Sequence, residues 1–216
     1  MYHRFEENKY PSTNIKINDF LNHIKLIKDE KISFIHPNDL IDSLRNMKSQ
    51  RKILITIDDG FLSFYEKAWP VLREQKIPFI LFVSTREVGK SGYMNWDQIR
   101  EVASSKIGVI GNHSHTHEYL ADSVEEVIIN DIQLSRKIFS RELKKNSSFF
   151  SYPFGEYSLK FKSIVKDLGF DIAVGQHSGV LDETKDLFEY PRFPINEKYG
   201  EEKRFKTLLK TLPFKY

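Results

Sequence analysis

The stretch Lys52-Ile-Leu-Ile-Thr-Ile-Asp-Asp-Gly60 is an apolar, β-branched run that stops at two carboxylates and a glycine. Such a run predicts a strand of a parallel sheet that is buried on both faces. Asp58 and Asp59 then lie at the carboxyl end of that strand, where α/β folds place ligands and catalytic groups. Two adjacent carboxylates repel each other, so the pair is the first indication of a metal site.

Similar apolar segments alternate with helical patterns along the rest of the chain. We expect strands at residues 32–35, 53–57, 78–83, 107–111, 148–152 and 170–174, with a last extended piece at 190–193. We expect helices at residues 19–28, 37–47, 61–75 with an interruption at Pro70, 95–102 with Asn95 as cap, 123–145, 158–168 and 201–212. This alternation indicates βαβ units. About seven repeats, with polar residues at most strand ends, favour an α/β fold of the (β/α)-barrel type over an open sheet.

Composition restricts the class of protein. With 216 residues, 40% of them hydrophobic, we expect a single domain over residues 1–216. The 33 basic and 30 acidic residues give a mixed surface that does not indicate a nucleic-acid partner. No apolar run reaches the roughly 18 residues of a membrane span. Because the chain has no cysteine, any metal must be bound by His and carboxylate side chains.

The N-terminal residues, Met1-Tyr-His-Arg-Phe-Glu-Glu, contain no apolar signal-peptide core. We therefore expect that the chain as written carries no export signal. This pattern fits a cytoplasmic protein, and it equally fits a secreted or cell-envelope protein whose N-terminus has been trimmed.

His113 and His117 follow the strand expected at 107–111 and are four residues apart. On one turn of helix this spacing brings two imidazoles to the same face, close enough to share a metal ion. Two His and one Asp leave open coordination positions, as in catalytic metal sites. A solvated helix face is the commoner reading of such a pair, but its position level with Asp58 and Asp59 favours the metal. His115 points away on a helical turn and is not expected to be a ligand.

Three ordered motifs resemble those of the polysaccharide deacetylases of the NodB homology domain, also called carbohydrate esterase family four. Thr56-Ile-Asp-Asp-Gly60 is similar to the family's Thr-Phe-Asp-Asp-Gly. Asn112-His-Ser-His-Thr-His117 is similar to His-Ser/Thr-x-x-His, and Tyr152-Pro-Phe-Gly155 to the end of Arg-x-Pro-Tyr/Phe-Gly. The resemblance spans nearly the whole chain and implies a distorted (β/α) barrel of NodB type.

Carried over by position, the resemblance implies that Asp58 is the general base. It implies that Asp59, His113 and His117 hold a divalent metal, most often zinc, with cobalt, nickel and manganese as alternatives. The metal polarises the acetyl carbonyl and lowers the pKa of a bound water to about 7 in favourable zinc sites. The oxyanion is then held by the metal and by a backbone N–H, for which Phe154 is the candidate.

Two positions depart from the family pattern. The third-motif arginine, which orients the catalytic aspartate in the family, is replaced by Ser151, and Arg192 is the candidate that supplies the missing guanidinium. The late Leu-x-His motif that brings the general acid is not found after Arg192. His177, at the end of a strand, is the replacement candidate because a protonated imidazole donates to a leaving amine. His3 is open between a place in the cleft and a core or surface role.

Substrate contacts are expected from aromatic and motif residues. Trp96 is a candidate wall for the sugar because aromatic faces stack on pyranose rings, although a tryptophan at a helix start is often part of the core. The third motif supplies Tyr152, Pro153, Phe154 and Gly155, for which an ordinary turn is the alternative.

The sequence thus predicts a metal-dependent hydrolase that removes N-acetyl groups from amino sugars of a polysaccharide, oligosaccharide or glycoconjugate. Its partner is an N-acetylated carbohydrate, the bond cleaved is a carbon–nitrogen bond other than a peptide bond, and we expect a monomer. Two alternatives stay open. One is an O-acetyl esterase on a polysaccharide, which uses the same water and metal. The other is a catalytically weak carbohydrate-binding relative, favoured by Ser151 and disfavoured by the intact Asp58, Asp59, His113 and His117.

Overall fold

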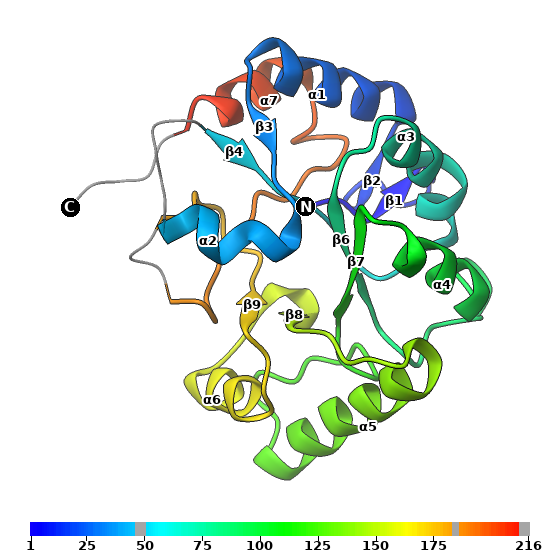
Figure 1. Cartoon of the computed structure of the whole chain (residues 1–216), viewed down its shortest axis with the longest axis vertical. Helices are drawn as coiled ribbons and strands as arrows, with labels where there is room; N and C mark the ends of the chain where they lie inside the picture. Colours follow the sequence, from blue (N-terminus) through cyan, green and yellow to red (C-terminus); the bar gives the residue numbers. More distant parts are fainter. Residues whose placement is uncertain (46–50, 183–185, 212–216) are drawn as a thin grey trace.

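A curled parallel sheet forms the centre of the computed structural model, which describes residues 1–45, 51–182 and 186–211 (Figure 1). Its five strands are hydrogen-bonded in chain order, β5-β6-β7-β8-β9. They span β5 Ile55–Ile57, β6 Phe79–Val83, β7 Gly108–Asn112, β8 Phe149–Ser151 and β9 Ile172–Val174. The α/β class and the parallel sheet are confirmed, but the sheet has five strands in place of the expected seven.

Two extended segments continue the curl on both sides of this sheet. Tyr2 forms a parallel bridge to Ile57 of β5, and Tyr190 forms one to Val174 of β9. The two segments also bond to each other, since the Met1 amine donates to the Phe193 carbonyl and the Ile195 N–H donates to the Met1 carbonyl, both at 2.9 Å. The curled sheet is therefore closed into a ring by backbone hydrogen bonds between the two extended segments, which are not regular strands.

The strand expected at residues 53–57 is divided in two. β4 Lys52–Ile53 pairs with β3 Ser33–Phe34 in a separate two-stranded sheet, and only β5 belongs to the main sheet. A second short parallel pair joins β1 Arg4–Phe5 to β2 Asn14–Ile15. The division places Asp58 directly after three buried residues of β5.

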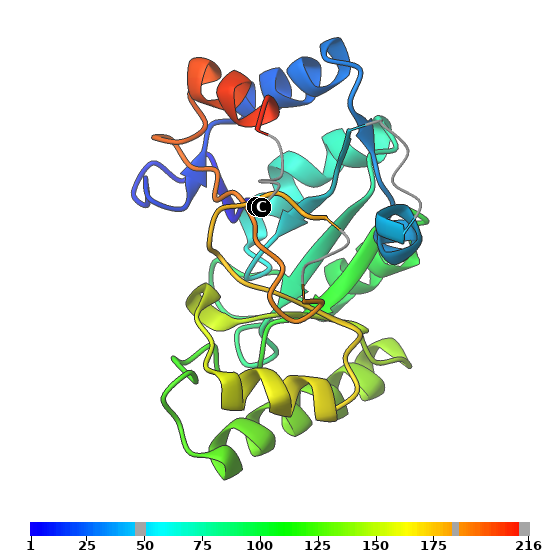
Figure 2. The same cartoon turned by 90° about the vertical axis from the view of Figure 1, so that its left-hand side faces the viewer.

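Helices surround the sheet. They are α1 Ile17–Asp29, the 3-10 turn η1 Pro37–Asp39, α2 Leu40–Arg45, α3 Trp69–Glu74, α4 Trp96–Ser104, α5 Glu125–Leu143, α6 Leu159–Asp167 and α7 Glu202–Leu209. α1 lies beside α7 at one end of the molecule, and α5 lies beside α6 at the other (Figure 2). The last residues of the helices expected at 37–47 and 201–212 lie outside the described residues. No described helix combines the length and the apolarity that a bilayer span needs.

Local sequence explains where several helices begin. Asn95 forms a capping box with Gln98 at the start of α4, as predicted. The helix expected at 61–75 is interrupted as expected near Pro70: a π-helical turn, η2 Phe64–Ala68, leads into α3, whose second residue is that proline.

The strands bury apolar side chains on both faces. Every residue of β6 is buried, and it is the only described strand of five residues for which this holds. Gly111 of β7 allows the sheet to curl tightly, because a Cβ at this position would lie 2.2 Å from the Phe82 ring. The carboxyl ends of the strands consequently converge on one edge of the ring, where the polar residues of the motifs lie.

Candidate metal centre

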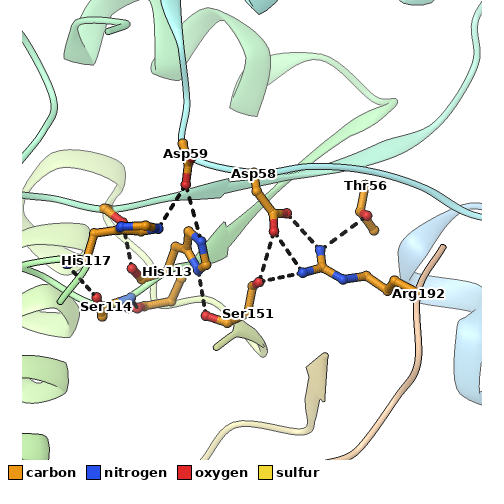
Figure 3. Close-up of polar contacts among 10 residues, drawn as sticks. Thr56, Asp58, Asp59, His113, Ser114, His117, Ser151 and Arg192 are labelled. Carbon is orange, nitrogen blue, oxygen red and sulfur yellow. Dashed lines mark hydrogen bonds and ion pairs between the residues drawn. The ribbon is translucent and has the colours of Figure 1, made fainter. Parts of the chain in front are cut away.

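Asp58 and Asp59 follow β5 at a sharp turn. Asp58 continues the strand, and its N–H donates to the Tyr2 carbonyl at 2.9 Å. Asp59 and Gly60 then both adopt left-handed backbone conformations, with φ of 74° and 71°. Asp is one of the few residues besides glycine that visit this region readily. The turn sends the two carboxylates to different neighbours: Asp59 faces two histidines and Asp58 faces an arginine (Figure 3).

His113 and His117 lie in a loop after β7, where a helical turn was expected. Ser114 and His117 have positive φ values of 66° and 57°, which a helix excludes. Side-chain hydrogen bonds hold the loop: Ser114 Oγ accepts from the His117 N–H at 3.0 Å, and Asn112 Oδ1 accepts from the Ser114 N–H at 2.9 Å. The loop brings the two imidazoles together, with ring centroids 4.8 Å apart, although its backbone is not helical.

Asp131 of α5 fixes this loop from the side. Its carboxylate accepts three hydrogen bonds, from the His115 N–H at 2.6 Å and from the N–H and hydroxyl of Thr116 at 3.0 and 2.6 Å. The side chain is buried and comes from an element that otherwise only covers the sheet. A buried aspartate that is satisfied by loop N–H groups is a positioning residue for the two histidines on either side of those groups.

Three ligand atoms converge at Asp59. Its Oδ1 lies 3.3 Å from His113 Nε2 and 3.1 Å from His117 Nε2 (Figure 3). Donor atoms of these three residues lie within 4.8 Å of one another. His113 Nδ1 is 2.6 Å from the Ser151 carbonyl, which only accepts, so this nitrogen donates to it and Nε2 is the atom that faces Asp59.

Whether a metal fits can be judged from the ligand atoms that converge at Asp59. Asp59 Oδ1 is buried and has no hydrogen-bond partner among the described residues. A buried carboxylate oxygen without a donor is costly, and a cation between it and two imidazole nitrogens removes that cost. The donor set of two nitrogens and one oxygen fits a divalent transition metal with open positions.

Electrostatics agree with this assignment. Burial opposes the ionisation of Asp59, but the imidazoles of His113 and His117 outweigh it and hold the pKa of Asp59 well below its usual range. Burial also lowers the pKa of His117, whereas the Asp59 carboxylate raises it by more. Asp59 is therefore ionised at neutral pH, as a metal ligand must be.

Asp58 forms a second, separate pair with Arg192. The guanidinium donates two hydrogen bonds of 2.7 Å, one to each carboxylate oxygen of Asp58, and both side chains are buried. Arg192 also donates from Nε to the Gly175 carbonyl at 2.8 Å, and Ser151 Oγ lies 2.9 Å from its Nη2 and 3.2 Å from Asp58 Oδ2. Burial raises the pKa of Asp58, but the contributions of Arg192, His113 and His3 together outweigh burial and lower it. Two parallel hydrogen bonds of this kind fix the orientation of the carboxylate and also stabilise its negative charge.

Comparison with known proteins identifies the family. The sequence model of the polysaccharide deacetylases matches residues 45–173, which is more than half of the chain. The chain belongs to the polysaccharide deacetylase family. Asp58, Asp59, His113, His117 and Ser151 all lie within the matched part, whereas Arg192 lies beyond it.

Relatives of this deacetylase-family chain extend the match to most of its length. YxkH of Bacillus subtilis (strain 168) is 23% identical over 91% of this chain and 70% of its own. A Staphylococcus aureus (strain MSSA476) protein named poly-beta-1,6-N-acetyl-D-glucosamine N-deacetylase is 24% identical over 85% of this chain and 68% of its own. The solved structure of IcaB from Ammonifex degensii superposes with a TM-score of 0.88 over 97% of this chain and 95% of that one, at 24% identity. The fold is therefore the NodB-like deacetylase fold.

His3 is the deacetylase residue that the sequence left open, and the structure brings it to the cluster. It follows Tyr2, whose carbonyl is bonded to the Asp58 N–H. Burial lowers the pKa of His3, the charges of Asp59 and Asp58 raise it, and Arg192 and His113 lower it again. The net effect is a lowered pKa for His3, with burial as the largest cause. The Met1-Tyr-His opening was the available signal, but sequence could not show that this segment closes the ring beside β5.

The role of His177 as general acid stays a prediction. It lies in an exposed turn, its ring is 6.3 Å from that of Tyr157, and its side chain forms no hydrogen bond with any described residue. Only its carbonyl is engaged, as acceptor of the Arg192 N–H at 2.9 Å. A strand was expected just before His177. β9 ends at Val174, and His177 is exposed in the turn that follows.

Two expected substrate contacts are core residues. Trp96 packs edge-on against Phe139 of α5 at 6.2 Å, which matches the alternative of a helix-start tryptophan that belongs to the core. Tyr152 is fully buried, and its hydroxyl donates to the Phe188 carbonyl at 3.1 Å. The Tyr152 ring is therefore withdrawn from solvent, whereas Trp96 is partly exposed and its contact with the sugar stays a prediction.

The rest of the third motif faces the cluster. Pro153 is buried and begins the 3-10 turn η3 Pro153–Gly155. Phe154 adopts a left-handed conformation, with φ of 59°, and its half-exposed ring lies 5.0 Å from that of His117. Gly155 cannot carry a side chain, because a Cβ would lie 2.1 Å from Gln176 Cβ. The motif thus presents one aromatic ring beside the metal ligands.

Proposed function

We propose that this chain is a metal-dependent hydrolase that removes N-acetyl groups from amino sugars of a polysaccharide or oligosaccharide. The observation that carries the proposal is the pair of carboxylates on one turn, where Asp59 faces two histidines and Asp58 is clamped by Arg192. Only the first carboxylate is directed at a metal. The second remains an ionised base beside it.

The metal ligands are Asp59, His113 and His117. A divalent ion held by them would polarise an acetyl carbonyl and acidify water. Two imidazoles and one carboxylate favour zinc, with cobalt, nickel and manganese as alternatives that the donor set also accepts. His113 is prepared for ligation because the Ser151 carbonyl holds its tautomer.

Asp58 is the proposed general base. Asp58 Oδ2 accepts from both Arg192 and Ser151, whereas Oδ1 accepts from Arg192 alone and so keeps a lone pair for a proton. The depressed pKa of Asp58 keeps it ionised across the neutral range. In the proposed reaction the water oxygen bonds to the acetyl carbon and Asp58 takes the water proton. The carbon–nitrogen bond then breaks, and the amine nitrogen gains a proton.

His3 replaces His177 as the proposed donor of that second proton. His3 follows Tyr2, whose carbonyl accepts from the Asp58 N–H at 2.9 Å, and this closeness to the base supports the role, since a general acid must lie within reach of the leaving atom. Burial lowers the pKa of His3, so the role requires that the Asp58 and Asp59 carboxylates keep its imidazole protonated. The proposal makes a distinction between substrates: an amine leaving group needs the proton, whereas an aryl ester leaving group does not. We expect His3→Gln to lower the rate of amide hydrolysis at least tenfold more than the rate of aryl acetate hydrolysis. General acid catalysis contributes roughly 10²–10⁴-fold to a rate, so a loss of this size is reasonable. Equal losses on both substrates would contradict the role of His3, and His177→Gln serves as the matched control.

The N-acetylated polymer as substrate is supported by the family and by the name of the Staphylococcus aureus relative. The test is acetate release from β-1,6-linked N-acetylglucosamine oligomers and from chitin oligomers, with zinc and with chelator. We expect release with zinc that is lost with chelator and in Asp58→Asn. Release that survives both changes would overturn the mechanism, and faster cleavage of O-acetylated than N-acetylated polymer would overturn the substrate. Sugar binding without any release would leave a binding protein in place of an enzyme.

A further inference from the structure

A buried histidine that is not among the metal ligands joins three segments that are far apart in the sequence. His23 of α1 is 1% exposed. Its Nε2 lies 2.6 Å from the Gly200 carbonyl oxygen, and its Nδ1 lies 3.1 Å from the Tyr2 hydroxyl oxygen. Its ring also stacks on Phe205 of α7, with ring centroids 3.8 Å apart and 12° between the planes. His23 therefore links α1 both to the N-terminal segment and to the residues that lead into α7.

The direction of both hydrogen bonds follows from the partners of His23. A carbonyl oxygen only accepts, so the bond to Gly200 places a proton on Nε2. Burial is the largest influence on the pKa of His23 and leaves it below the ordinary value, so the ring is uncharged at neutral pH. Burial also raises the pKa of the Tyr2 hydroxyl, which therefore keeps its proton. Nδ1 is then the acceptor of the Tyr2 O–H, and both ring nitrogens are used inside the core.

Tyr2 connects His23 to the proposed general base. The Tyr2 N–H donates to the Thr56 carbonyl at 2.8 Å, and the Tyr2 carbonyl accepts from the Asp58 N–H at 2.9 Å. The backbone of Tyr2 therefore sets the position of the backbone that carries the Asp58 carboxylate. The side chain of Tyr2 is anchored at its hydroxyl by His23. His3, the proposed proton donor, is the next residue along the same segment.

Close packing fixes the opposite end of this connection at Gly200. A Cβ on Gly200 would lie 2.5 Å from Ile15 Cδ1 and 3.1 Å from His23 Cε1, so the position has no room for a side chain. The Gly200 N–H donates to the Asn196 carbonyl at 2.6 Å. The Gly200 carbonyl is therefore held in one place, and it gives His23 a fixed point against which to hold Tyr2.

We propose that His23 is a positioning residue for Asp58 and His3, because it holds Tyr2, whose backbone holds Asp58, against the fixed carbonyl of Gly200. The proposal rests on the proposed function and deepens it, since it makes the docking of α7 on α1 a condition for catalysis. A histidine that only fills the core would contribute to stability alone. Here the loss of its two hydrogen bonds should also change the position of the base in protein that is fully folded.

The first test measures the backbone at Asp58 without turnover. Amide hydrogen exchange of chelator-treated protein is followed by NMR for the Asp58 N–H, with the Leu81 N–H of β6 as reference. We expect His23→Leu and Tyr2→Phe each to speed exchange at Asp58 about tenfold relative to Leu81, because the segment that accepts from Asp58 is released. His23→Gln keeps one donor and one acceptor and should restore most of the protection. Ile24→Ala, which opens a cavity at a buried position of the same helix, should leave the ratio unchanged. Tyr2→Phe removes only a hydroxyl and keeps the test open if His23→Leu does not fold.

Activity tests the consequence for catalysis. With zinc and N-acetylglucosamine oligomers, we expect His23→Leu and Tyr2→Phe to lower kcat about tenfold with little change in KM, since the base is misplaced while the sugar contacts stay. His23→Gln should recover most of kcat, and Ile24→Ala should keep it. Wild-type exchange ratios or wild-type kcat values in both variants would overturn the proposal, and so would an equal loss of kcat in Ile24→Ala. Faster exchange at Asp58 in protein that releases no acetate in any form would reject the proposed function and leave the hold of His23 on Asp58 intact.

Discussion

The carboxylate of Asp58 and the guanidinium of Arg192 form a buried, two-point ion pair across 134 residues of sequence, with both nitrogen–oxygen distances at 2.7 Å. Arg192 belongs to the extended segment that follows Tyr190, whereas Asp58 ends β5 on the other side of the ring closure. Ser151, the residue at the family's arginine position, touches both partners through its hydroxyl. The guanidinium is therefore supplied to the same carboxylate from a different strand end.

Removing Arg192 should harm both stability and activity. Arg192→Met leaves a buried carboxylate without its counter-charge, for which we expect a loss of about 3–5 kcal/mol in the free energy of unfolding. Arg192→Lys keeps the charge but not the two parallel hydrogen bonds, so its stability should be intermediate while its kcat falls. Urea denaturation and acetate release measure the two effects.

The Ser151 position offers a control for this interpretation. Arg192→Ser combined with Ser151→Arg moves the guanidinium to the position where the family carries it. We expect the double variant to recover activity over Arg192→Ser alone, because the Ser151 side chain already lies beside Asp58. A double variant that is folded and as inactive as Arg192→Ser would show that the position of the guanidinium, and not only its presence, is required.

Metal binding should be visible in thermal unfolding. Zinc added to chelator-treated protein at about 100 times its dissociation constant is expected to stabilise the fold by roughly 2.7 kcal/mol. Asp59→Ala and His117→Ala should lose this shift. His115→Ala should keep it, because His115 Nδ1 faces the Thr85 hydroxyl at 2.8 Å and is not one of the converging donors. A shift that survives in Asp59→Ala would place the metal elsewhere.

Asp131 should control metal affinity without touching the metal. Asp131→Asn replaces an acceptor of loop N–H groups by an amide that also donates, and the loop that carries both histidines loses its anchor. We expect a 10–100-fold weaker zinc affinity, the usual effect of residues that orient ligands. Competition titration with a chromophoric chelator measures it. Glu126→Gln, an exposed change in the first turn of the same helix, should bind zinc like wild type.

The stabilising effect of the Asp58–Arg192 pair should decrease at acid pH. Burial raises the pKa of Asp58, but Arg192, with smaller contributions from His113 and His3, outweighs burial, so the folded value lies below the ordinary 3.8. The unfolded chain then binds more protons in acid. The contribution of Asp58 to stability is therefore complete above its unfolded pKa and is lost as pH falls through the folded one. We expect the free energy of unfolding, measured by urea with chelator between pH 3 and 7, to fall less steeply in acid for Asp58→Asn than for wild type. Parallel curves would contradict the shift.

Sequence reasoning was accurate where short-range pattern determines structure. The apolar run before Asp58 predicted β5 and its position, and Asn95 predicted the start of α4. It failed where the neighbours of a residue come from distant segments. His113 and His117 converge because Asp131 and two left-handed residues shape a loop, and the i, i+4 spacing by itself would also suit a solvated helix face.

The remaining differences have the same origin. Of the seven expected strands, the one at 32–35 contributes β3 to a separate sheet and the one at 190–193 forms only a bridge to β9, so five lie in the main sheet. The alternation of strands and helices could not show this division. Local pattern also could not show which aromatic side chain faces the site: Trp96 packs on α5, whereas Tyr93 lines a pocket together with Asp59 and His117. Which aromatic ring faces a ligand is decided by the packing of loops, and single-sequence periodicity carries no information on it.

The closure of the ring by residues 190–195 has a consequence for the order in which the site is completed during synthesis. Asp59, His113 and His117 all precede residue 118, but the groups that hold the two histidines, Asp131 of α5 and the Ser151 carbonyl of β8, come later in the chain. Asp58 receives its guanidinium only after residue 192 has left the ribosome and docked beside Met1. The histidines can therefore be fixed before Arg192 reaches Asp58, and the clamp on Asp58 is the last part of the site to form.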